Sequence, residues 1–321
     1  MNQQFRAKLE EVKDEKKPFW SVMIPAYNCA LHLRKTLESV LAQDPGTEHM
    51  QIEVIDDCSS DNPEKVVQEV GRGRVGYFRQ EKNVGHTKNF ETCLKRSKGL
   101  WVHQLHGDDY VLSGFYDEMK KLIDANVEIG AAFCQNFMVN EFDQFIGLSG
   151  LIQTQAGVIP EFLKSIAYQQ QIFTPSIVVK RSVYEDLGGF DERLKWCEDW
   201  EMWVRISKKY AVGYLPKPLA CYRVHNTSNT ARYAKNAIKM YDFVEGIKMV
   251  NAYLPESERA VHLKQVLNHY GETWVIYEIE NALKGGDKKT AWSNWKLANR
   301  ITSAATVKIR LAKLAYRIAK A

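Results

Sequence analysis

The sequence predicts an α/β fold with a mostly parallel, Rossmann-like central sheet flanked by helices, followed by a helical C-terminal region. Along residues 19–124, short apolar strands alternate with helices of 3.6-residue periodicity through short connections, which is typical of βαβ units. From about residue 232 onward the pattern is helical throughout. We therefore expect an N-terminal arm at 1–18, a catalytic or binding domain at 19–231 and a helical region at 232–321.

The expected elements follow in order along the chain. Strands are predicted near residues 19–25, 52–55, 75–78, 100–105, 131–139, 176–179 and 211–215. Helices are predicted at 31–41, up to 70, after 83–85 through Lys88 and Asn89, and at 112–124, 183–190 and 196–209. Pro25 should end the first strand, because proline interrupts a central ladder. Ser60 or Asp61 should cap the second helix. We expect residues 140–160 to form a long irregular connection. We also expect about four C-terminal helices, with breaks at Pro255 and at Gly285.

Composition points to a soluble globular protein of the cytoplasm. The chain has 321 residues, of which 45% are hydrophobic and 26% charged, and no apolar run approaches the ~20 residues of a membrane span. Residues 1–17 lack the apolar core of a secretion signal. The six cysteines are scattered singly with no Cys-x-x-Cys pair, so we expect reduced thiols and no zinc knuckle.

The positive charge is concentrated at the C-terminus. The net charge is +5, and the last eighteen residues alone carry five cations and no acid, so residues 1–303 are balanced. This distribution argues against nucleic-acid binding across the main domain. Along the last helix the cations Arg310, Lys313, Arg317 and Lys320 are spaced 3, 4 and 3 residues apart. The helix could lie on anionic lipid at the inner face of the membrane, or it could be a packing helix with a solvated face.

An acidic turn follows the apolar stretch 100–105. Asp108 and Asp109 are adjacent carboxylates, which are costly to bury unless they are paired or hold a metal. Hard cations such as Mg²⁺ or Mn²⁺ prefer carboxylate oxygen, and ligands of open α/β sheets gather at the carboxyl ends of strands. The alternative is an ordinary surface turn, in which Asp bonds its own backbone.

Three further motifs accompany this turn, and all four together resemble the family-2 glycosyltransferases, inverting enzymes with the GT-A fold, over about residues 19–230. The matching segments are Pro25-Ala26-Tyr27-Asn28, Asp56-Asp57-Cys58-Ser59-Ser60-Asp61, Asn83-Val84-Gly85 and Leu105 to Asp109, with Glu198-Asp199 resembling the family's base motif. One departure concerns His106, which occupies the first acidic position of the family's Asp-x-Asp segment. His106 could ligate the metal, contact sugar or simply fill the turn, and we expect the last.

The resemblance implies a role for each matched residue. Asp199, supported by Glu198, would remove the proton of the acceptor hydroxyl. Asp108, Asp109 and His225 would hold Mn²⁺ or Mg²⁺. The donor nucleotide would contact Pro25, Ala26, Tyr27, Asn28, Asp56, Asp57, Asn83, Lys88, Asp108 and Arg223. Lys88 stands where the family often has Arg, and it lacks that residue's bidentate fork.

The implied activity is transfer of a sugar from a UDP-sugar to a glycan or lipid-linked hydroxyl acceptor, with inversion, in cell-surface polysaccharide or glycoconjugate biosynthesis. The alternative is a non-catalytic nucleotide-sugar-binding or scaffold protein of the same fold, for which a carboxylate at Asp199 would have little purpose. A nucleotidyltransferase would need a Gly-rich phosphate loop after the first strand, and residues 25–28 do not provide one. The sequence does not identify the donor sugar, the acceptor or the oligomeric state.

Overall fold

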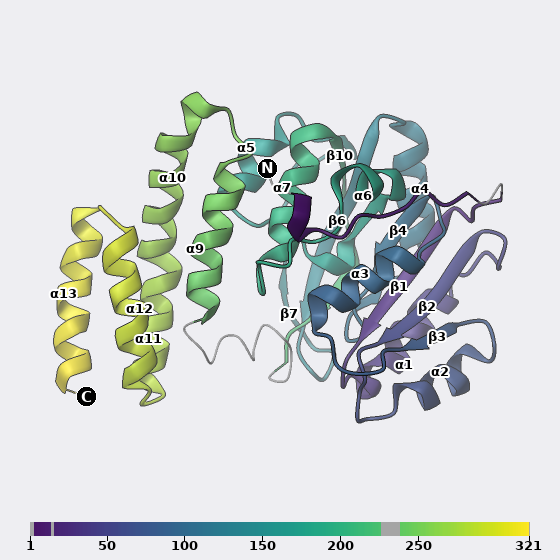
Figure 1. Ribbon diagram of the computed structural model, residues 1–321, viewed down its shortest axis with the longest axis horizontal. Helices are drawn as coiled ribbons and strands as arrows, with labels where there is room; N and C mark the ends of the chain where they lie inside the picture. The colour runs from purple at the N-terminus through teal and green to yellow at the C-terminus, as the bar shows by residue number, and fades with distance from the viewer. Residues whose placement is uncertain (1–2, 14–15, 226–237, 321) are drawn as a thin grey trace. The chain divides into compact units, whose positions relative to one another are not determined.

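The computed structural model describes residues 3–13, 16–225 and 238–320 (Figure 1). The chain divides into two compact units. The first unit contains 1–162, 171–193 and 205–225, and the second contains 163–170, 194–204 and 226–321. The first unit holds the sheet, and the second holds the C-terminal helices together with the beginning of α7 (Glu198–Lys209).

Ten strands form one mixed sheet. They are β1 (Trp20–Ala26), β2 (Met50–Asp56), β3 (Gly76–Arg79), β4 (Trp101–Gln104), β5 (Tyr110–Val111), β6 (Ile129–Val139), β7 (Phe145–Leu148), β8 (Gly157–Val158), β9 (Ile177–Lys180) and β10 (Ala211–Arg223). The order is β3-β2-β1-β4-β9-β6-β10-β5, with β7 beside β6 and β8 beside β10. The pairs along β3-β2-β1-β4 and the β6–β10 pair are parallel, and the remaining pairs are antiparallel. The predicted α/β class is confirmed.

Helices cover both faces of the sheet. They are α1 (Ala30–Leu41), α2 (Pro63–Gly71), α3 (His86–Arg96), α4 (Phe115–Ala125), α5 (Phe162–Tyr168) and α6 (Arg181–Leu187), with short 3₁₀ turns at Gln3–Phe5 and Thr174–Ser176. Apolar side chains of α1, α2 and α4 pack on β1 and β2 in one core, which includes Leu33, Leu37 and Phe115, all fully buried. In Figure 1, α3 lies in front of β1 and β4. This covering leaves the carboxyl ends of the strands as the place where polar groups collect.

Two proline predictions are wrong. β1 continues through Pro25 to Ala26. β4 pairs with β1 only as far as Met23, and the Pro25 carbonyl accepts a hydrogen bond from the N–H of Gly107 (3.1 Å) on that side. The missing proline N–H points to that same side, beyond the last β1–β4 pair, and pairing with β2 continues through Pro25 and Ala26. β10 likewise runs past both of its prolines, because register shifts between Leu215 and Ala220 absorb them.

The predicted cap of the second helix is also wrong. The cap residue of α2 is Asn62, whose side chain makes no capping hydrogen bond, and Pro63 occupies the first turn. The Asp61 carboxylate instead accepts from the N–H of Ala30 at the start of α1 (2.7 Å), and Ser60 bonds Asn28. These side chains therefore join two strand exits rather than terminate a helix. A further difference is that α4 begins at Phe115 rather than 112, because Tyr110–Val111 forms strand β5 against β10.

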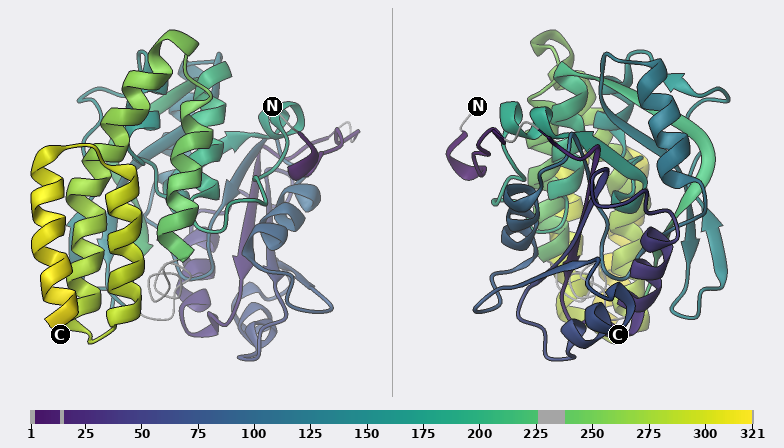
Figure 2. Two further views of the ribbon diagram at one scale, coloured as in Figure 1. Left: turned by 60° about the vertical axis from the view of Figure 1, so that its left-hand side comes forward. Right: turned by 90° about the vertical axis from the view of Figure 1, so that its right-hand side faces the viewer.

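The second unit is helical. Within the described residues it contains α9 (Ile238–Asn251), α10 (Glu256–Tyr270), a π-helical turn (Gly271–Val275), α11 (Ile276–Lys284), α12 (Lys288–Ile301) and α13 (Ala305–Lys320). Figure 2 shows α10 to α13 side by side. Their shared core includes Ile279, Leu297 and Leu311, each at most 1% exposed. No helix among the described residues has the length and apolar character needed to cross a membrane.

Candidate functional site

The acidic turn lies where β4 ends, against α1. Thr36 of α1 donates its hydroxyl to the carbonyls of Asp109 (2.6 Å) and Gly107 (3.1 Å), and this pins the turn from inside the core. Gly107 has no room for a side chain, because a Cβ there would lie 2.7 Å from the Cys29 sulfur. The turn is therefore held by specific contacts and is not a free surface loop.

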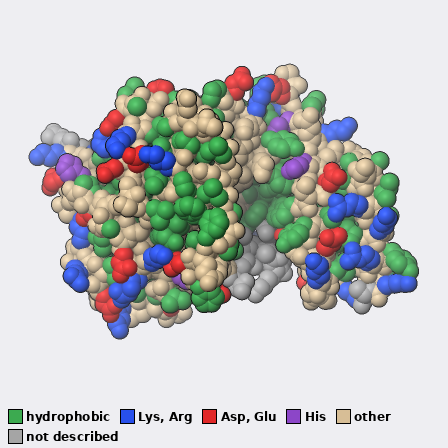
Figure 3. Space-filling model, turned by 180° about the vertical axis from the view of Figure 1, so that it is seen from behind, with side chains coloured by type: hydrophobic (Ala, Val, Ile, Leu, Met, Phe, Trp, Pro, Cys, Tyr) green, Lys and Arg blue, Asp and Glu red, His purple; other side chains and the backbone are tan. Residues whose placement is uncertain are grey.

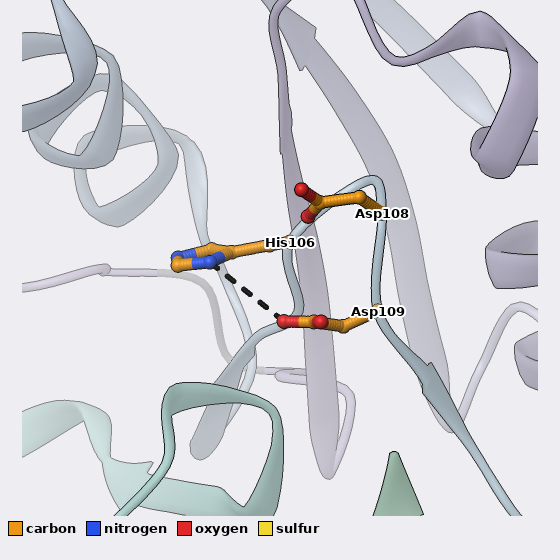
Figure 4. A group of neighbouring side chains, drawn as sticks. All are labelled: His106, Asp108 and Asp109. Carbon is orange, nitrogen blue, oxygen red and sulfur yellow. Dashed lines mark ion pairs between the residues drawn. The ribbon is translucent and has the colours of Figure 1, made fainter. Parts of the chain in front are cut away.

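His106, Asp108 and Asp109 form a potential metal-binding group. One ligand atom from each lies within 4.8 Å of the others, and Figure 4 shows the three side chains pointing to the same side of the turn. The Asp109 carboxylate is 1% exposed. Its Oδ2 accepts no hydrogen bond from the described residues and lies 3.8 Å from His106 Nδ1. A buried carboxylate oxygen without a donor needs a positive charge. The residues present thus fit a divalent cation, and an imidazole neighbour suits Mn²⁺ better than Mg²⁺.

The two neighbouring carboxylates have opposite pKa shifts. Burial and the adjacent Asp108 charge raise the pKa of Asp109 well above its ordinary value. Burial also acts to raise the pKa of Asp108, but the hydrogen bond from His225 and the charges of His106 and His225 outweigh it, so that pKa is lowered. The ionised form is thus favoured at Asp108 and disfavoured at Asp109, and a nearby cation would favour ionisation of both.

Arg223 and His225, both from the end of β10, complete the surroundings of the turn. His225 Nε2 lies 2.9 Å from Asp108 Oδ2. The Arg223 backbone N–H donates to Asp109 Oδ1 (2.8 Å), and its guanidinium donates to the Asp108 carbonyl and pairs with Asp143 at 2.7 Å. Arg223 is 3% exposed, so in this geometry it braces the acidic turn.

Asp56 stands at the neighbouring strand exit and is fully buried. Its carboxylate accepts from Arg79, from the Tyr77 hydroxyl (2.8 Å) and from Ser59 through both the backbone N–H (3.0 Å) and the hydroxyl. Burial, followed by the bond to Asp56, raises the pKa of Tyr77. The Asp56 oxygens are thus already engaged, and Arg79 is the exposed edge of this cluster.

Asp57 joins the second strand exit to the third motif. Its carboxylate accepts from the N–H groups of Val84 (2.7 Å) and Gly85 (3.0 Å), while Asn83 donates to the Asp57 carbonyl (3.2 Å). Gly85 has φ +87°, which glycine adopts without strain. This pair of bonds fixes the start of α3, whose exposed Lys88 lies in the first turn. The structure therefore brings the sequence-predicted Asp57 and Asn83 together.

The first motif meets the acidic turns through its backbone. Asn28, at φ +50°, donates its N–H to the Ser59 hydroxyl (2.9 Å) and accepts from the Ser60 N–H (2.8 Å). The Ala26 carbonyl accepts from the N–H of Asp57 (2.9 Å). Tyr27 keeps 40% of its surface exposed. Pro25 to Asn28 thus form one edge of a continuous polar surface with the exits of β2 and β4.

Glu198 and Asp199 begin α7 in the second unit. Asp199 accepts from the Trp200 N–H (2.6 Å) and from the side-chain amide of Gln170 (3.2 Å). Glu198 is 6% exposed. Negative charge at a helix N-terminus is favourable, and the bonds from Trp200 and Gln170 fix the orientation of the Asp199 carboxylate.

Several residues of these clusters were not singled out by sequence reasoning. Arg79 could have been found, because it ends β3 opposite Asp56 in a parallel pair, at the same sheet edge. His32 of α1, whose ring centroid lies 5.2 Å from that of His225, had no local signal. Burial, and then the charges of Arg223 and His225, lower the pKa of His32. Asp143 and Gln170 lie in the stretch that was predicted to be irregular.

Comparison with solved structures defines the class of fold. Staphylococcus aureus TarS residues 1–349, solved with UDP-GlcNAc, superposes with a TM-score of 0.68 at 17% identity, covering 93% of this chain and 88% of that chain. The mannosyltransferase PcManGT of Pyrobaculum calidifontis, solved with GDP-Man and Mn²⁺, gives a TM-score of 0.56 at 14% identity, covering 95% and 86%. The fold is GT-A, as the resemblance implied.

The sequence comparison gives the family. Residues 21–178 match the model described as Glycosyl transferase family 2. A Bacillus subtilis relative whose name assigns it to teichuronic acid biosynthesis, TuaG, is 25% identical over 250 or so residues, with 74% of this chain and 92% of the relative covered. The chain therefore belongs to glycosyl transferase family 2, and it is a glycosyltransferase.

Proposed function

We propose that this chain transfers a sugar from a UDP-sugar to a hydroxyl of a glycan or lipid-linked acceptor, with inversion at the anomeric carbon and with Mn²⁺ or Mg²⁺ bound. The observation that carries the proposal is the acidic turn, where the buried Asp109 Oδ2 has no hydrogen-bond donor beside Asp108 and His106. It lies at the carboxyl ends of parallel strands, where ligands of α/β sheets bind. Family membership supports the same reaction class.

The donor assignment is supported by the strand exits and by the relatives. TarS has been solved with UDP-GlcNAc and with UDP, and PcManGT with GDP-Man and Mn²⁺. In this chain, Tyr27 and Arg79 are the partly exposed groups beside the buried Asp56. The TuaG name refers to teichuronic acid biosynthesis, which supports our placing of the reaction in polysaccharide biosynthesis. We propose that it takes place at the cytoplasmic face of the membrane.

In the proposed reaction, Asp199 accepts the proton of the acceptor hydroxyl as that oxygen attacks the anomeric carbon. The carbon–oxygen bond to the diphosphate breaks in line, the configuration inverts, and UDP leaves. Hydrogen bonds from Gln170 and the Trp200 N–H fix the orientation of Asp199. Asp108 and Asp109, with His106 or His225 beside them, would hold the cation. The cation, when bound, neutralises charge developing on the departing diphosphate.

A thermal-shift panel tests the donor and metal assignments together. The protein is heated with UDP, UDP-GlcNAc, UDP-glucose, GDP and GDP-mannose, each with Mn²⁺, Mg²⁺ or EDTA. A ligand at 100 times its Kd stabilises the folded state by about 2.7 kcal/mol, so selective stabilisation by uridine nucleotides with Mn²⁺ is the expected result. Stabilisation by guanosine nucleotides alone would overturn the UDP assignment. The anomeric configuration of the product, read by NMR, tests inversion.

We also propose that α13 contacts anionic lipid through its outer face. Arg310, Lys313, Arg317 and Lys320 are exposed there, and α13 contains no acid. Figure 3 shows blue basic side chains outnumbering red acidic ones over the C-terminal helices. The apolar face of α13 is already used, because Val307, Leu311, Leu314 and Ile318 are buried in the helical core. The contact is therefore mainly electrostatic, at about 1 kcal/mol per basic residue near the surface.

Charge reversal tests this contact without removing buried side chains, as truncation of α13 would. Lys313→Glu/Arg317→Glu should reduce sedimentation with phosphatidylserine-containing vesicles and lower its salt dependence. The control is Lys8→Glu/Lys13→Glu, an equal charge change at exposed positions of the first unit. Equal loss in both variants would reduce the effect to net charge, and no loss in either would leave α13 a packing helix.

A further inference from the structure

The loop before α7 is held by a carboxylate from the C-terminal helices. Asp242 of α9 accepts from the backbone N–H groups of Lys195 (2.9 Å), Trp196 (2.9 Å) and Cys197 (3.4 Å). These three residues immediately precede Glu198. Asp242 and residues 195–197 all belong to the second unit. A single side chain therefore accepts from three consecutive backbone N–H groups in the segment that leads into α7.

One turn further along α9, Gly246 packs directly against the same loop. A Cβ at Gly246 would lie 2.4 Å from the Cys197 sulfur, a distance that real side chains do not tolerate. The sulfur itself lies 3.5 Å from the Asp242 carbonyl and 3.4 Å from its Oδ2. Positions 242 and 246 share one face of the helix. Helix α9 therefore packs against this loop through the Asp242 carboxylate and through the backbone of Gly246, which has no side chain.

A second hydrogen bond to this part of the chain comes from Tyr253, which lies just after the end of α9, and it reaches α7. Tyr253 donates its hydroxyl to Glu201, which is completely buried one turn into α7. The first turn of α7 is thus tied at its preceding loop by Asp242 and at Glu201 by Tyr253. Asp199 lies between these two anchors, so its backbone position is set by contacts made with residues at and beyond α9.

We propose that Asp242 is a positioning residue for the catalytic carboxylate Asp199. This inference rests on the proposed role of Asp199 as general base. Asp242 acts by fixing the backbone of 195–197, and through it the direction in which α7 presents Asp199. Displacing a catalytic group by about 1 Å can reduce turnover about 10²-fold, because proximity and orientation supply much of the rate. The helical region is then part of the catalytic apparatus.

Kinetics of Asp242→Ala and Asp242→Asn test the proposal in the full-length protein. Donor-site concentration is measured by titration with UDP and Mn²⁺, and transfer rates are expressed per donor site. We expect kcat per site to fall about 10- to 100-fold in the Ala variant, with the donor KM within about twofold of wild type. The Asn variant should fall less, because it keeps one acceptor oxygen. Unchanged kcat per site in both variants overturns the proposal.

Val244→Ala is the matched control. Val244 lies on the same helix, is 2% exposed and packs into the core of the C-terminal helices. Its truncation should lower the melting temperature while leaving kcat per donor site unchanged. A fall in kcat per site as large as that of Asp242→Ala at equal destabilisation would mean that α9 acts only through stability, which also overturns the proposal.

A rescue experiment probes the same geometry and does not depend on Asp242 variants that fold. Gly246→Ala should lower kcat per site, because the new Cβ meets the Cys197 sulfur. Adding Cys197→Ala removes that sulfur and leaves the Cys197 Cβ 3.6 Å away, in ordinary contact, so most of the turnover should return. Absence of rescue contradicts the proposal.

Failure of the proposed function is distinguishable from failure of the positioning role of Asp242. If wild type transfers no sugar, or if Asp199→Asn retains wild-type turnover, the proposed function itself is wrong.

Discussion

Replacing Asp109 by Asn should have opposite effects on the metal-free and the metal-loaded protein. Asp109 Oδ2 is buried without a hydrogen-bond donor, while Oδ1 accepts the Arg223 N–H at 2.8 Å. Asn can preserve the Oδ1 bond and carries no ionisable group. At neutral pH in EDTA the raised pKa of Asp109 costs the folded wild type either a proton uptake or a buried charge, so the variant, which avoids both, should be more stable than wild type. The neighbouring Asp108→Asn should be less stable, because it weakens the 2.9 Å contact with His225.

The response to Mn²⁺ should change in the other direction. Wild type at 100 times its Kd for Mn²⁺ gains about 2.7 kcal/mol by mass action. Asp109→Asn loses a charged ligand, and most of this gain should disappear. The difference in the free energy of unfolding between variant and wild type should therefore shrink or change sign when Mn²⁺ is added. A purely structural defect would leave that difference unchanged.

Urea unfolding in EDTA and in Mn²⁺, followed by tryptophan fluorescence, measures both effects. The control is Asp117→Asn, an exposed carboxylate of α4, which should change stability by less than about 1 kcal/mol and keep the full metal response. A less stable Asp109→Asn in EDTA would refute the reasoning about the unpartnered oxygen. An undiminished Mn²⁺ response would remove Asp109 from the metal site.

Three further predictions concern separate parts of the molecule. Asp199→Asn should reduce turnover about 10²- to 10⁴-fold with unchanged UDP affinity, and a parallel loss of both would make it a structural cap. Burial, with a smaller contribution from His106, lowers the pKa of His103 from 6.5 to about 4. As the pH falls below 6.5, His103 is therefore protonated in the unfolded state but still neutral in the folded state. Stability should fall by about 3 kcal/mol between these pH values, and ¹⁵N NMR should show a neutral ring at pH 5.5. Gly99→Ala should lower the free energy of unfolding by about 1–3 kcal/mol, measured by urea titration, because the new Cβ would lie 2.6 Å from the Trp20 carbonyl carbon.

The sequence predicted the parts of the fold that depend on local pattern. The apolar periodicity of 31–41 matches α1 within one residue, because the burial of one helix face repeats along successive residues. The predictions for Pro25 and for the end of β10 failed, because the tolerance of a proline depends on which neighbour its missing N–H would face. That neighbour is set by pairing between distant strands.

Residue type and order, taken together with the family resemblance, were enough to propose site roles for Asp56, Asp57, Asp108 and Asp109 at the strand exits. What the sequence could not supply is which groups satisfy them. Asp109 and Arg223 are 114 residues apart, and Asp57 and Val84 are 27 apart. The bonds that hold Lys195 to Cys197 come from a helix more than forty residues later. Such partners are chosen by three-dimensional packing, because hydrogen bonds and buried charges depend on proximity in space, whereas the sequence pattern records only the local preference for burial.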